Sequence, residues 1–303
     1  MTECTDFQKK FQAVAGGIKL LPNELLSRHT SFKIGGPAEL MAFPNNPEEL
    51  GALLKLSAEL DIKPVILGAG TNILAPDEGI KGLVICLKDC LGGLEELEGD
   101  RISVMAGVTL TRAAMFAANL GLSGMEFAHG IPGTVGGGIY MNAGAYGGEL
   151  CQICESVDVM GLDGEVTRYT CEQMQFSYRH SILEEIGGIV IRAIFRLQKG
   201  SVDAIKDKMK ELIGKRSASQ PLDLPSAGSA FKRPVGGYAA ALIDQAGLKG
   251  YRVGGAAVSE KHAGFVVNLG GASAADVRKL LAEVSDKVFE NSGIRIEPEV
   301  RIW

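Results

Sequence analysis

The sequence predicts an α+β protein built from two domains, because three observations agree. The chain has 303 residues, which is long enough for two domains or for one large domain with a subdivision. Apolar residues make up 46% and charged residues 22%, as in globular proteins with a sizeable core. Helical and strand patterns occur in both halves, and the composition changes near residues 199–204. We therefore expect domains at 1–199 and 204–303.

The first half of the chain alternates between helical and strand patterns. Segment 47–62 has leucines at helical spacing, and the apolar run that follows it ends in the glycine turn GAGTN (68–72). A second helix is expected over 109–122, where a glycine stops it. A turn at Asp163-Gly164 between two β-rich runs predicts a hairpin over 156–169. Further strands are expected at 82–87, 101–107 and 187–197.

The second half begins with a polar helix, expected from about 202 to 216, and a loop with three prolines. Its best-marked helix starts after Ser273, which can cap the helix together with Asp276 three residues later. The apolar residues of that helix then share one stripe. The remaining expected elements are a helix at 238–248 and strands at 251–258, 263–269 and 294–303.

Charge and cysteine content exclude several classes. A net charge of −5 argues against non-specific nucleic-acid binding. The sequence shows neither a signal-peptide pattern nor an apolar run of transmembrane length, so we expect a cytoplasmic protein with no membrane contact. The six cysteines then read as free thiols. Cys151 and Cys154 form a lone C-x-x-C, a weak zinc or redox signal, while Cys4, Cys86, Cys90 and Cys171 are isolated and no metal site is expected.

Two uncharged glycine loops are the strongest functional signal. One is GAGTN at 68–72, and the other is GIPGTVGGGIYMNAGAYGG at 130–148, where nineteen residues include eight glycines. Glycine lets backbone N–H groups converge on one point, because no Cβ blocks the approach. Convergent N–H groups bind anions, so two such loops suit a diphosphate held by amides, with Asn72 and Asn142 as polar anchors.

The usual nucleotide motifs do not account for these loops. GAGTNI begins like G-x-G-x-x-G but lacks the third glycine, and no G-x-x-x-x-G-K-[ST] occurs. The alternative is that both loops are tight turns that serve only the fold.

Six motifs occur in the order found in one family of flavoenzymes. They are TSFKIGGPAEL, VILGAGTNIL, GIPGTVGGGIYMNAGAYGGEL, FSYRHS, SAGSAFKRP and IEPEVRIW. From about Thr30 to Trp303 the chain resembles the UDP-N-acetylenolpyruvoylglucosamine reductases. The resemblance implies a vanillyl-alcohol-oxidase (p-cresol-methylhydroxylase) type FAD-binding domain of two subdomains, at about 20–88 and 89–199, plus a C-terminal α+β substrate domain. It also implies that the glycine loops grip FAD without a covalent bond. The implied cofactor-binding residues are Gly68, Ala69, Gly70, Thr71, Asn72, Gly130, Ile131, Pro132, Gly133, Thr134, Gly136, Gly137, Asn142, Gly144 and Ala145.

The resemblance further implies a reaction and three catalytic residues. Hydride would pass from NADPH by way of FAD to the alkene of UDP-N-acetylglucosamine enolpyruvate, giving UDP-N-acetylmuramate. Arg179 matches the family's arginine and could grip the carboxylate with two hydrogen bonds. Ser229 matches the proton donor, and Glu299 matches the C-terminal acid. The chain lacks the family's inserted tyrosine loop after the arginine motif, so it resembles the short-form branch.

Other residues carry open alternatives. Lys232 and Arg233 could meet the UDP diphosphate or be solvated loop charges, and Tyr178 could contact substrate or simply pack. We expect a monomer. Three rival functions are another FAD-dependent oxidoreductase of the same fold, a non-catalytic nucleotide-binding module, and a serine hydrolase. The last rests on the S-x-x-K at 229–232, but S-D-N and K-T-G are missing and Pro234 follows at once.

Overall fold

The computed structural model describes residues 6–14 and 16–303, which group into two compact units. The first unit holds the described residues up to Asn23 together with Glu39–Ala69 and Lys81–Gly214. The second holds Glu24–Ala38, Gly70–Ile80 and Lys215–Trp303. Both units are therefore discontinuous in sequence, while the domain limits expected near 199–204 stay a prediction.

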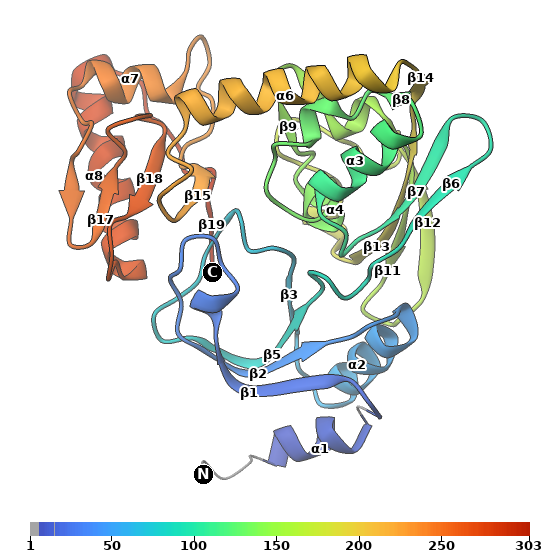
Figure 1. The fold of residues 1–303 in the computed structure, drawn as a ribbon. Coiled ribbons are helices and arrows are strands. Elements are labelled where there is room, and N and C mark those ends of the chain that lie inside the picture. Colours follow the sequence, from blue (N-terminus) through green and yellow to red (C-terminus); the bar gives the residue numbers. More distant parts are fainter. Residues whose placement is uncertain (1–5, 15) are drawn as a thin grey trace. The chain divides into compact units, whose positions relative to one another are not determined.

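The first strands of the sequence form a four-stranded sheet with the order β1-β2-β5-β3 (Figure 1). Its strands are β1 (Lys19–Leu25), β2 (Pro37–Phe43), β5 (Ile80–Cys86) and β3 (Val65–Leu67), and β3 runs parallel to β5. Helices α1 (Asp6–Val14) and α2 (Pro47–Glu59) pack against each other. The side chain of Asn46 caps α2 by accepting from the amide of Glu49, and the buried face of α2 carries the predicted leucines. This confirms the predicted helix.

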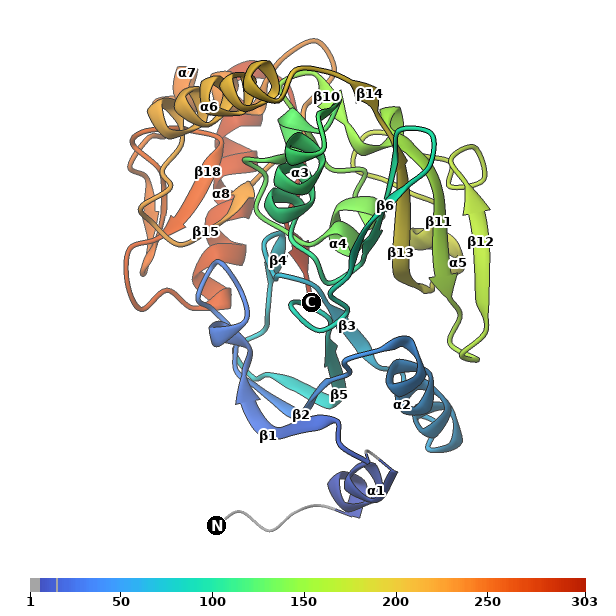
Figure 2. The ribbon, with the colours of Figure 1, turned by 45° about the vertical axis from the view of Figure 1, so that its right-hand side comes forward.

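The second sheet of the first unit has five antiparallel strands in the order β12-β11-β13-β7-β6. Figure 2 shows β12, β11 and β13 side by side. The helix α4 (Val135–Tyr140) packs on β13 and β7, and it also contacts α3 (Leu110–Asn119). The glycine-rich segment is therefore an ordered part of this layer. The strands are β6 (Leu94–Leu97), β7 (Arg101–Met105), β11 (Cys154–Met160), β12 (Val166–Thr170) and β13 (Ile189–Arg196).

The second unit contains a four-stranded sheet with the order β15-β18-β17-β16, packed against α8 (Ala274–Ser292). The predicted capping box is present: Ser273 accepts from the amide of Asp276, and Asp276 accepts from the amide of Ser273. The predicted apolar stripe of α8 is buried, and α7 (Ala239–Gln245) packs on the same helix. The strands are β15 (Ser226–Ser229), β16 (Arg252–Val253), β17 (Ala256–Val258) and β18 (Phe265–Asn268).

The last strand differs from its prediction. Only Arg301–Ile302 form a strand, β19, which pairs in parallel with β4 (Ile73–Leu74). Pro298 makes just an isolated bridge with Phe231, and the amide of Ala230 donates to the carbonyl of Gly264 and not to Glu299, so a ladder over 294–303 does not form. The polar helix α6 (Val202–Ser219) is longer than expected. The remaining elements are η1 (Leu26–Arg28), β8 (Leu122–Ser123), η2 (Glu126–Ala128), β9 (Gly144–Ala145), β10 (Gly148–Glu149), η3 (Leu150–Gln152), α5 (Leu183–Ile186) and β14 (Gln198–Lys199).

Candidate active site

The two glycine loops meet in the first unit. A Cβ added at Gly68, directly after β3, would lie 2.8 Å from the Oγ1 atom of Thr134 in the second loop. Thr134 is only 2% exposed, and its Oγ1 atom also accepts a 3.3 Å hydrogen bond from the amide of Gly137, which caps α4. The close approach therefore requires a glycine at position 68. Gly68 and Thr134 lie more than sixty positions apart in the sequence, and their two loops thus form one surface of bare backbone.

Several amides at this surface have no partner within the part of the chain that the structure describes. They are the N–H groups of Gly68, Ala69, Gly133 and Thr134. Buried backbone donors without an acceptor are uncommon, and Thr134 is buried. A group of convergent free amides fits the oxygens of a diphosphate. Because there is also no Cβ on the two glycines, these residues fit a diphosphate-bearing cofactor such as FAD.

Gly70, in the second unit, must be a glycine because of its backbone conformation and a close backbone contact. Its φ is +62°, and an added Cβ would lie 2.2 Å from the carbonyl oxygen of His29. The carbonyl of Gly70 accepts from both the amide and the hydroxyl of Ser31, at 3.0 and 3.3 Å. The hydroxyl of Ser31 also lies 2.6 Å from the carbonyl of Ser226. Ser31 therefore holds the GAGTN turn, a role that the sequence analysis missed although the residue lies in the TSFKIGG motif.

The glycines of α4 divide into packing and exposed positions. A Cβ at Gly136 would lie 2.9 Å from the Cβ of Ala106, and one at Gly138 would lie 2.9 Å from Leu150. These two glycines let the helix sit close to its neighbours. Gly137 is exposed, and a Cβ added there would lie 3.6 Å from Thr134 Oγ1, at ordinary contact distance. Among these three, Gly137 is the position with room for a ligand.

The loop after α4 is fixed by Asn142, which is 1% exposed and has a φ of +41°. Its Nδ2 atom donates to Glu149 Oε2 and to the carbonyl of Ser177, both at 3.0 Å. Its Oδ1 atom accepts from the amide of Cys151 at 3.0 Å. The amide group is thus fully engaged inside the chain and shapes the loop. Gly144 lies in the same loop, where a Cβ would meet the carbonyl of Gly148 at 2.6 Å.

Arg179 lies in a tight turn of the first unit. Ser177 and His180 exchange two backbone hydrogen bonds of 3.2 Å, and Arg179 between them has a φ of +55°. Its Nη2 atom donates to the carbonyl of Gly144 at 3.2 Å, and its guanidinium lies 4.9 Å from the ring centre of Tyr178. A non-glycine residue at positive φ is costly and often marks a functional position. The structure therefore brings Arg179 and Tyr178 to the glycine-rich loop.

Ser229 and Glu299 lie together in the second unit. The amide of Glu299 donates a 2.9 Å hydrogen bond to the carbonyl of Ala230, the residue after Ser229. Ser229 ends β15, is exposed, and its hydroxyl makes no hydrogen bond to any described residue. The side chain of Asn72 donates to the carbonyl of Glu299 at 3.3 Å, and its carbonyl accepts from the amide of Arg301 at 2.9 Å. The GAGTN turn and Glu299 are thus joined directly.

Glu297 pairs with the same segment, but two positions further from Ser229 than Glu299 does. Glu297 pairs with Lys232, whose amide donates to its carbonyl at 2.8 Å and whose Nζ atom lies 3.4 Å from its carboxylate. Both side chains are at least half exposed. Arg233, the other expected substrate contact, lies 4.0 Å from the ring centre of Tyr238 in the exposed loop that follows.

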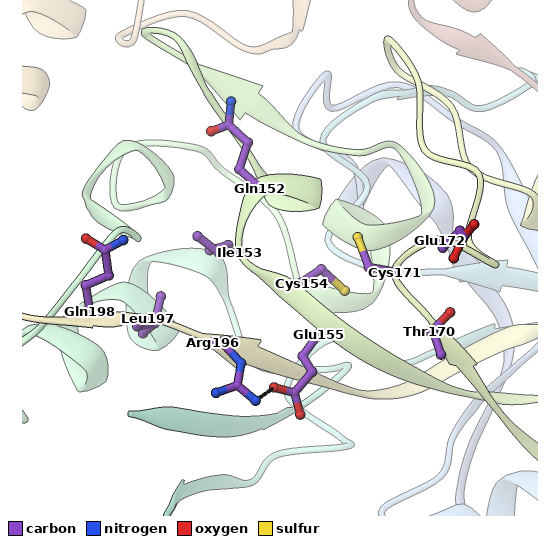
Figure 3. Close-up of a pocket in the computed structure, with 10 residues that line it drawn as sticks. All are labelled: Gln152, Ile153, Cys154, Glu155, Thr170, Cys171, Glu172, Arg196, Leu197 and Gln198. Carbon is purple, nitrogen blue, oxygen red and sulfur yellow. Dashed lines mark ion pairs between the residues drawn. The ribbon is translucent and has the colours of Figure 1, made fainter. Parts of the chain in front are cut away.

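The pocket in Figure 3 contains none of these residues. Its walls come from β11, β12, β13 and the adjoining turns, and an ion pair between Arg196 and Glu155 crosses it. The ten residues in Figure 3 include the thiols of Cys154 and Cys171. Neither its position nor its charges fit a diphosphate, so we do not assign the active site to it.

The five described cysteines are free thiols, and Cys4 lies outside the described residues. Burial raises the pKa of Cys86 to about 11 and raises the pKa of Cys154 as well. Both thiols therefore stay protonated near neutral pH and are poor nucleophiles. Within residues 6–14 and 16–303, no three metal-ligating side chains are grouped as an ion requires, and no helix is long and apolar enough to cross a membrane.

Comparisons with known proteins define the class of the chain. Residues 38–170, which include both glycine loops, match the model of an FAD-binding domain family. Residues 220–303 match the model of the UDP-N-acetylenolpyruvoylglucosamine reductase C-terminal domain, and they include Ser229 and Glu299. The protein is therefore an FAD-dependent oxidoreductase with an α+β fold.

Full-length relatives give the particular family. A UDP-N-acetylenolpyruvoylglucosamine reductase of Caldanaerobacter subterraneus is 47% identical over 94% of this chain and 93% of the relative. One from Clostridium novyi is 42% identical over 100% of this chain and 98% of the relative. The crystal structure of the reductase from Thermus caldophilus matches with a TM-score of 0.79 at 37% identity, over 94% and 98% of the two chains. The chain belongs to the UDP-N-acetylenolpyruvoylglucosamine reductase family.

Proposed function

We propose that this protein reduces UDP-N-acetylglucosamine enolpyruvate to UDP-N-acetylmuramate with NADPH, a step of peptidoglycan synthesis. The names of the relatives support the substrate. The observation that carries the proposal is the pairing of the Ser229 segment with Glu299, because a flavin-binding protein without this reaction has no need of that pair. The rival serine hydrolase is not supported, since Ser229 ends a strand and does not open a helix.

The cofactor would be held by the residues at the meeting of Gly68 and Thr134. The unpartnered amides of Gly68, Ala69, Gly133 and Thr134 would bind the FAD diphosphate, and Gly137 would leave room for it. Thr71, Gly130, Ile131, Pro132, Gly144 and Ala145 would complete the two loops. Bound FAD supplies hydride transfer from NADPH to the enolpyruvyl double bond. In this proposal FAD is bound without a covalent bond to a histidine.

Arg179 would hold the carboxylate of the substrate. Reduction of the double bond drives negative charge onto that carboxylate. A guanidinium can stabilise this growing charge by donating two parallel hydrogen bonds. The turn that fixes the backbone of Arg179 reduces the freedom that binding must remove. Tyr178, 46% exposed and beside the guanidinium, would contact the sugar nucleotide.

Ser229 would deliver the proton to the carbon beside the carboxylate. A hydroxyl is a weak acid, so it can act only on a strongly basic carbanion-like intermediate. Its exposure and lack of a hydrogen-bond partner among the described residues leave it available. Glu299 would stabilise the same intermediate, while Lys232 and Arg233 would meet the UDP diphosphate. We also propose that the domain limits lie near 199–204 and that the protein is a monomer.

The test is a coupled assay of purified protein with NADPH and the enolpyruvyl sugar nucleotide. We expect a yellow protein whose flavin absorbance is bleached by NADPH and restored by the sugar nucleotide, with UDP-N-acetylmuramate as product. A flavin that NADPH bleaches but that the sugar nucleotide cannot restore would instead favour another oxidoreductase of the same fold. Limited proteolysis and sedimentation would test the domain limits and the monomeric state.

A further inference from the structure

Asn142 links the FAD loop to the arginine turn, and we infer that it is a positioning residue for Arg179. The inference rests on the proposed function, because it assigns a second residue to the carboxylate site. Asn142 follows α4, and its three side-chain hydrogen bonds do not involve the unpartnered amides near Thr134. Its contacts lead instead to the hairpin formed by β9 and β10 and to Ser177.

The hydrogen bonds of Asn142 specify an amide at this position. The amide of Cys151 can only donate, so it fixes Oδ1, while the carbonyl of Ser177 can only accept, so it fixes Nδ2. Glu149 Oε2 takes the second Nδ2 hydrogen at 3.0 Å. All three bonds lie in a site that is 1% exposed. A carboxylate of the same shape would place an oxygen against two acceptors, so the position discriminates between Asn and Asp.

These bonds reach Arg179 by two routes. Asn142 holds the carbonyl of Ser177, which starts the four-residue turn that carries Arg179 at positive φ. The same hairpin offers the carbonyl of Gly144 to the Nη2 atom of Arg179 at 3.2 Å. On the far side of the turn, the fully buried Ser181 donates to the carbonyl of Tyr140 at 2.8 Å. The turn is thus fastened on both sides to residues 140–144.

A positioned guanidinium is needed because bidentate binding tolerates little error. A displacement of about 1 Å can lower a rate by about a hundredfold. Loosening the Ser177 end of the turn frees the backbone of Arg179 without removing its charge. Substrate binding and reduction should then weaken, while the diphosphate amides near Thr134 keep their geometry.

The test compares Asn142→Asp with the wild-type holoenzyme. We expect the dissociation constant of the enolpyruvyl sugar nucleotide, read from the flavin absorbance, to rise at least tenfold. The rate at which that substrate reoxidises the reduced flavin should fall by a similar factor. The FAD dissociation constant and the rate of bleaching by NADPH should change less than about threefold. Ser181→Ala removes the far anchor without adding charge and should show the same pattern more weakly.

The matched control is Gln152→Ala. Gln152 bonds the amide of Glu149 and the carbonyl of Gly147 in the same hairpin but does not reach Ser177. It should leave all four quantities unchanged. A double-mutant cycle between Asn142→Asp and Arg179→Lys should be strongly non-additive, because Arg179→Lys removes the guanidinium that Asn142→Asp displaces.

Two results would overturn the inference. One is loss of FAD in proportion to the loss of substrate reduction, which would make Asn142 a general support of the loop. The other is unchanged substrate binding in both Asn142→Asp and Ser181→Ala. A wild-type protein that never turns over the sugar nucleotide would refute the proposed function itself, which is a distinguishable outcome.

Discussion

The amide of Glu299 donates a hydrogen bond of 2.9 Å to the carbonyl of Ala230, so the C-terminal segment pairs with the residues that follow Ser229. Ala230 and Glu299 are almost seventy positions apart in the sequence. The pairing is made by the backbone, so it does not depend on the protonation of the carboxylate. It places Glu299 beside Ser229, whereas Glu297 pairs two positions further along the same segment, at Lys232.

Ser229→Ala should separate the two halves of the reaction. NADPH should still bleach the flavin at the wild-type rate, because that step needs no proton from Ser229. Reoxidation by the enolpyruvyl sugar nucleotide should slow by about 10²–10⁴-fold, the usual contribution of a positioned proton donor. Stopped-flow absorbance measures both rates in one preparation. If both survive intact, the assigned role of Ser229 is wrong.

Arg179→Lys should impair substrate reduction more than NADPH oxidation. The substitution keeps the positive charge but loses the planar fork that binds a carboxylate with two hydrogen bonds. It also loses the Nη2 bond to the carbonyl of Gly144. We expect kcat/KM for the sugar nucleotide to fall by about ten- to a hundredfold, which corresponds to about 1.4–2.7 kcal/mol. An equal fall in the rate of flavin bleaching by NADPH would argue against carboxylate binding.

Gly68→Val should empty the flavin site. The added Cβ would lie 2.8 Å from Thr134 Oγ1, which must then move and give up its cap on Gly137. We expect the FAD dissociation constant, measured by flavin fluorescence, to rise at least tenfold. Gly214→Ala is the matched control, since a Cβ there meets nothing within 4 Å in α6 and should stabilise the helix by about 0.5–1 kcal/mol. Full retention of FAD in Gly68→Val would contradict the role of the bare backbone.

Asp158→Asn should destabilise the five-stranded sheet in a pH-dependent way. Asp158 on β11 accepts hydrogen bonds from Arg168 on β12, at 2.6 and 3.1 Å, and from Arg192 on β13. Burial alone would raise the pKa of Asp158, but hydrogen bonds and charge from the two arginines outweigh it and lower the pKa. We expect a loss of about 1–3 kcal/mol in the free energy of unfolding at pH 7, measured by urea denaturation.

The sign of the pH dependence follows from the lowered pKa. A carboxyl whose pKa is lower in the folded state stabilises the protein above its unfolded pKa of about 3.9. That stabilisation is lost as the pH falls through the folded pKa. The difference between wild type and Asp158→Asn should therefore be constant near neutral pH and shrink in acid. A difference that grows in acid would contradict the assignment.

Local signals in the sequence predicted most of the helices. They could not predict which distant segments pair with each other. Ser273 and Asp276 lie three positions apart and identified the start of α8 correctly, because a capping box is a local interaction. The strand expected over 294–303 was wrong except for β19, since Ala230 donates its amide to Gly264 and the pairing with Pro298 stays an isolated bridge. The grouping of Glu24–Ala38 with the C-terminal segment leaves no periodic trace in either stretch.

The same limit applies to the candidate site. The glycine loops were visible because glycine at such density is unusual, and their meeting at Gly68 and Thr134 agrees with that signal. Motif resemblance pointed to Ser229 and Glu299, and their pairing required the structure. Asn142 could be named from the sequence as a polar residue of the glycine loop. Its three hydrogen bonds to Glu149, Cys151 and Ser177 depend on the tertiary fold, which no local pattern describes.

The discontinuity of the second unit bears on how the chain folds during synthesis. Glu24–Ala38 and Gly70–Ile80 leave the ribosome early, yet the segment that they pack with begins only at Lys215. At about 5–20 residues per second, they wait for several seconds or longer with apolar side chains such as Phe32 and Leu74 uncovered. We expect slow translation or a chaperone to matter more for this unit than for the contiguous five-stranded sheet that is finished before it.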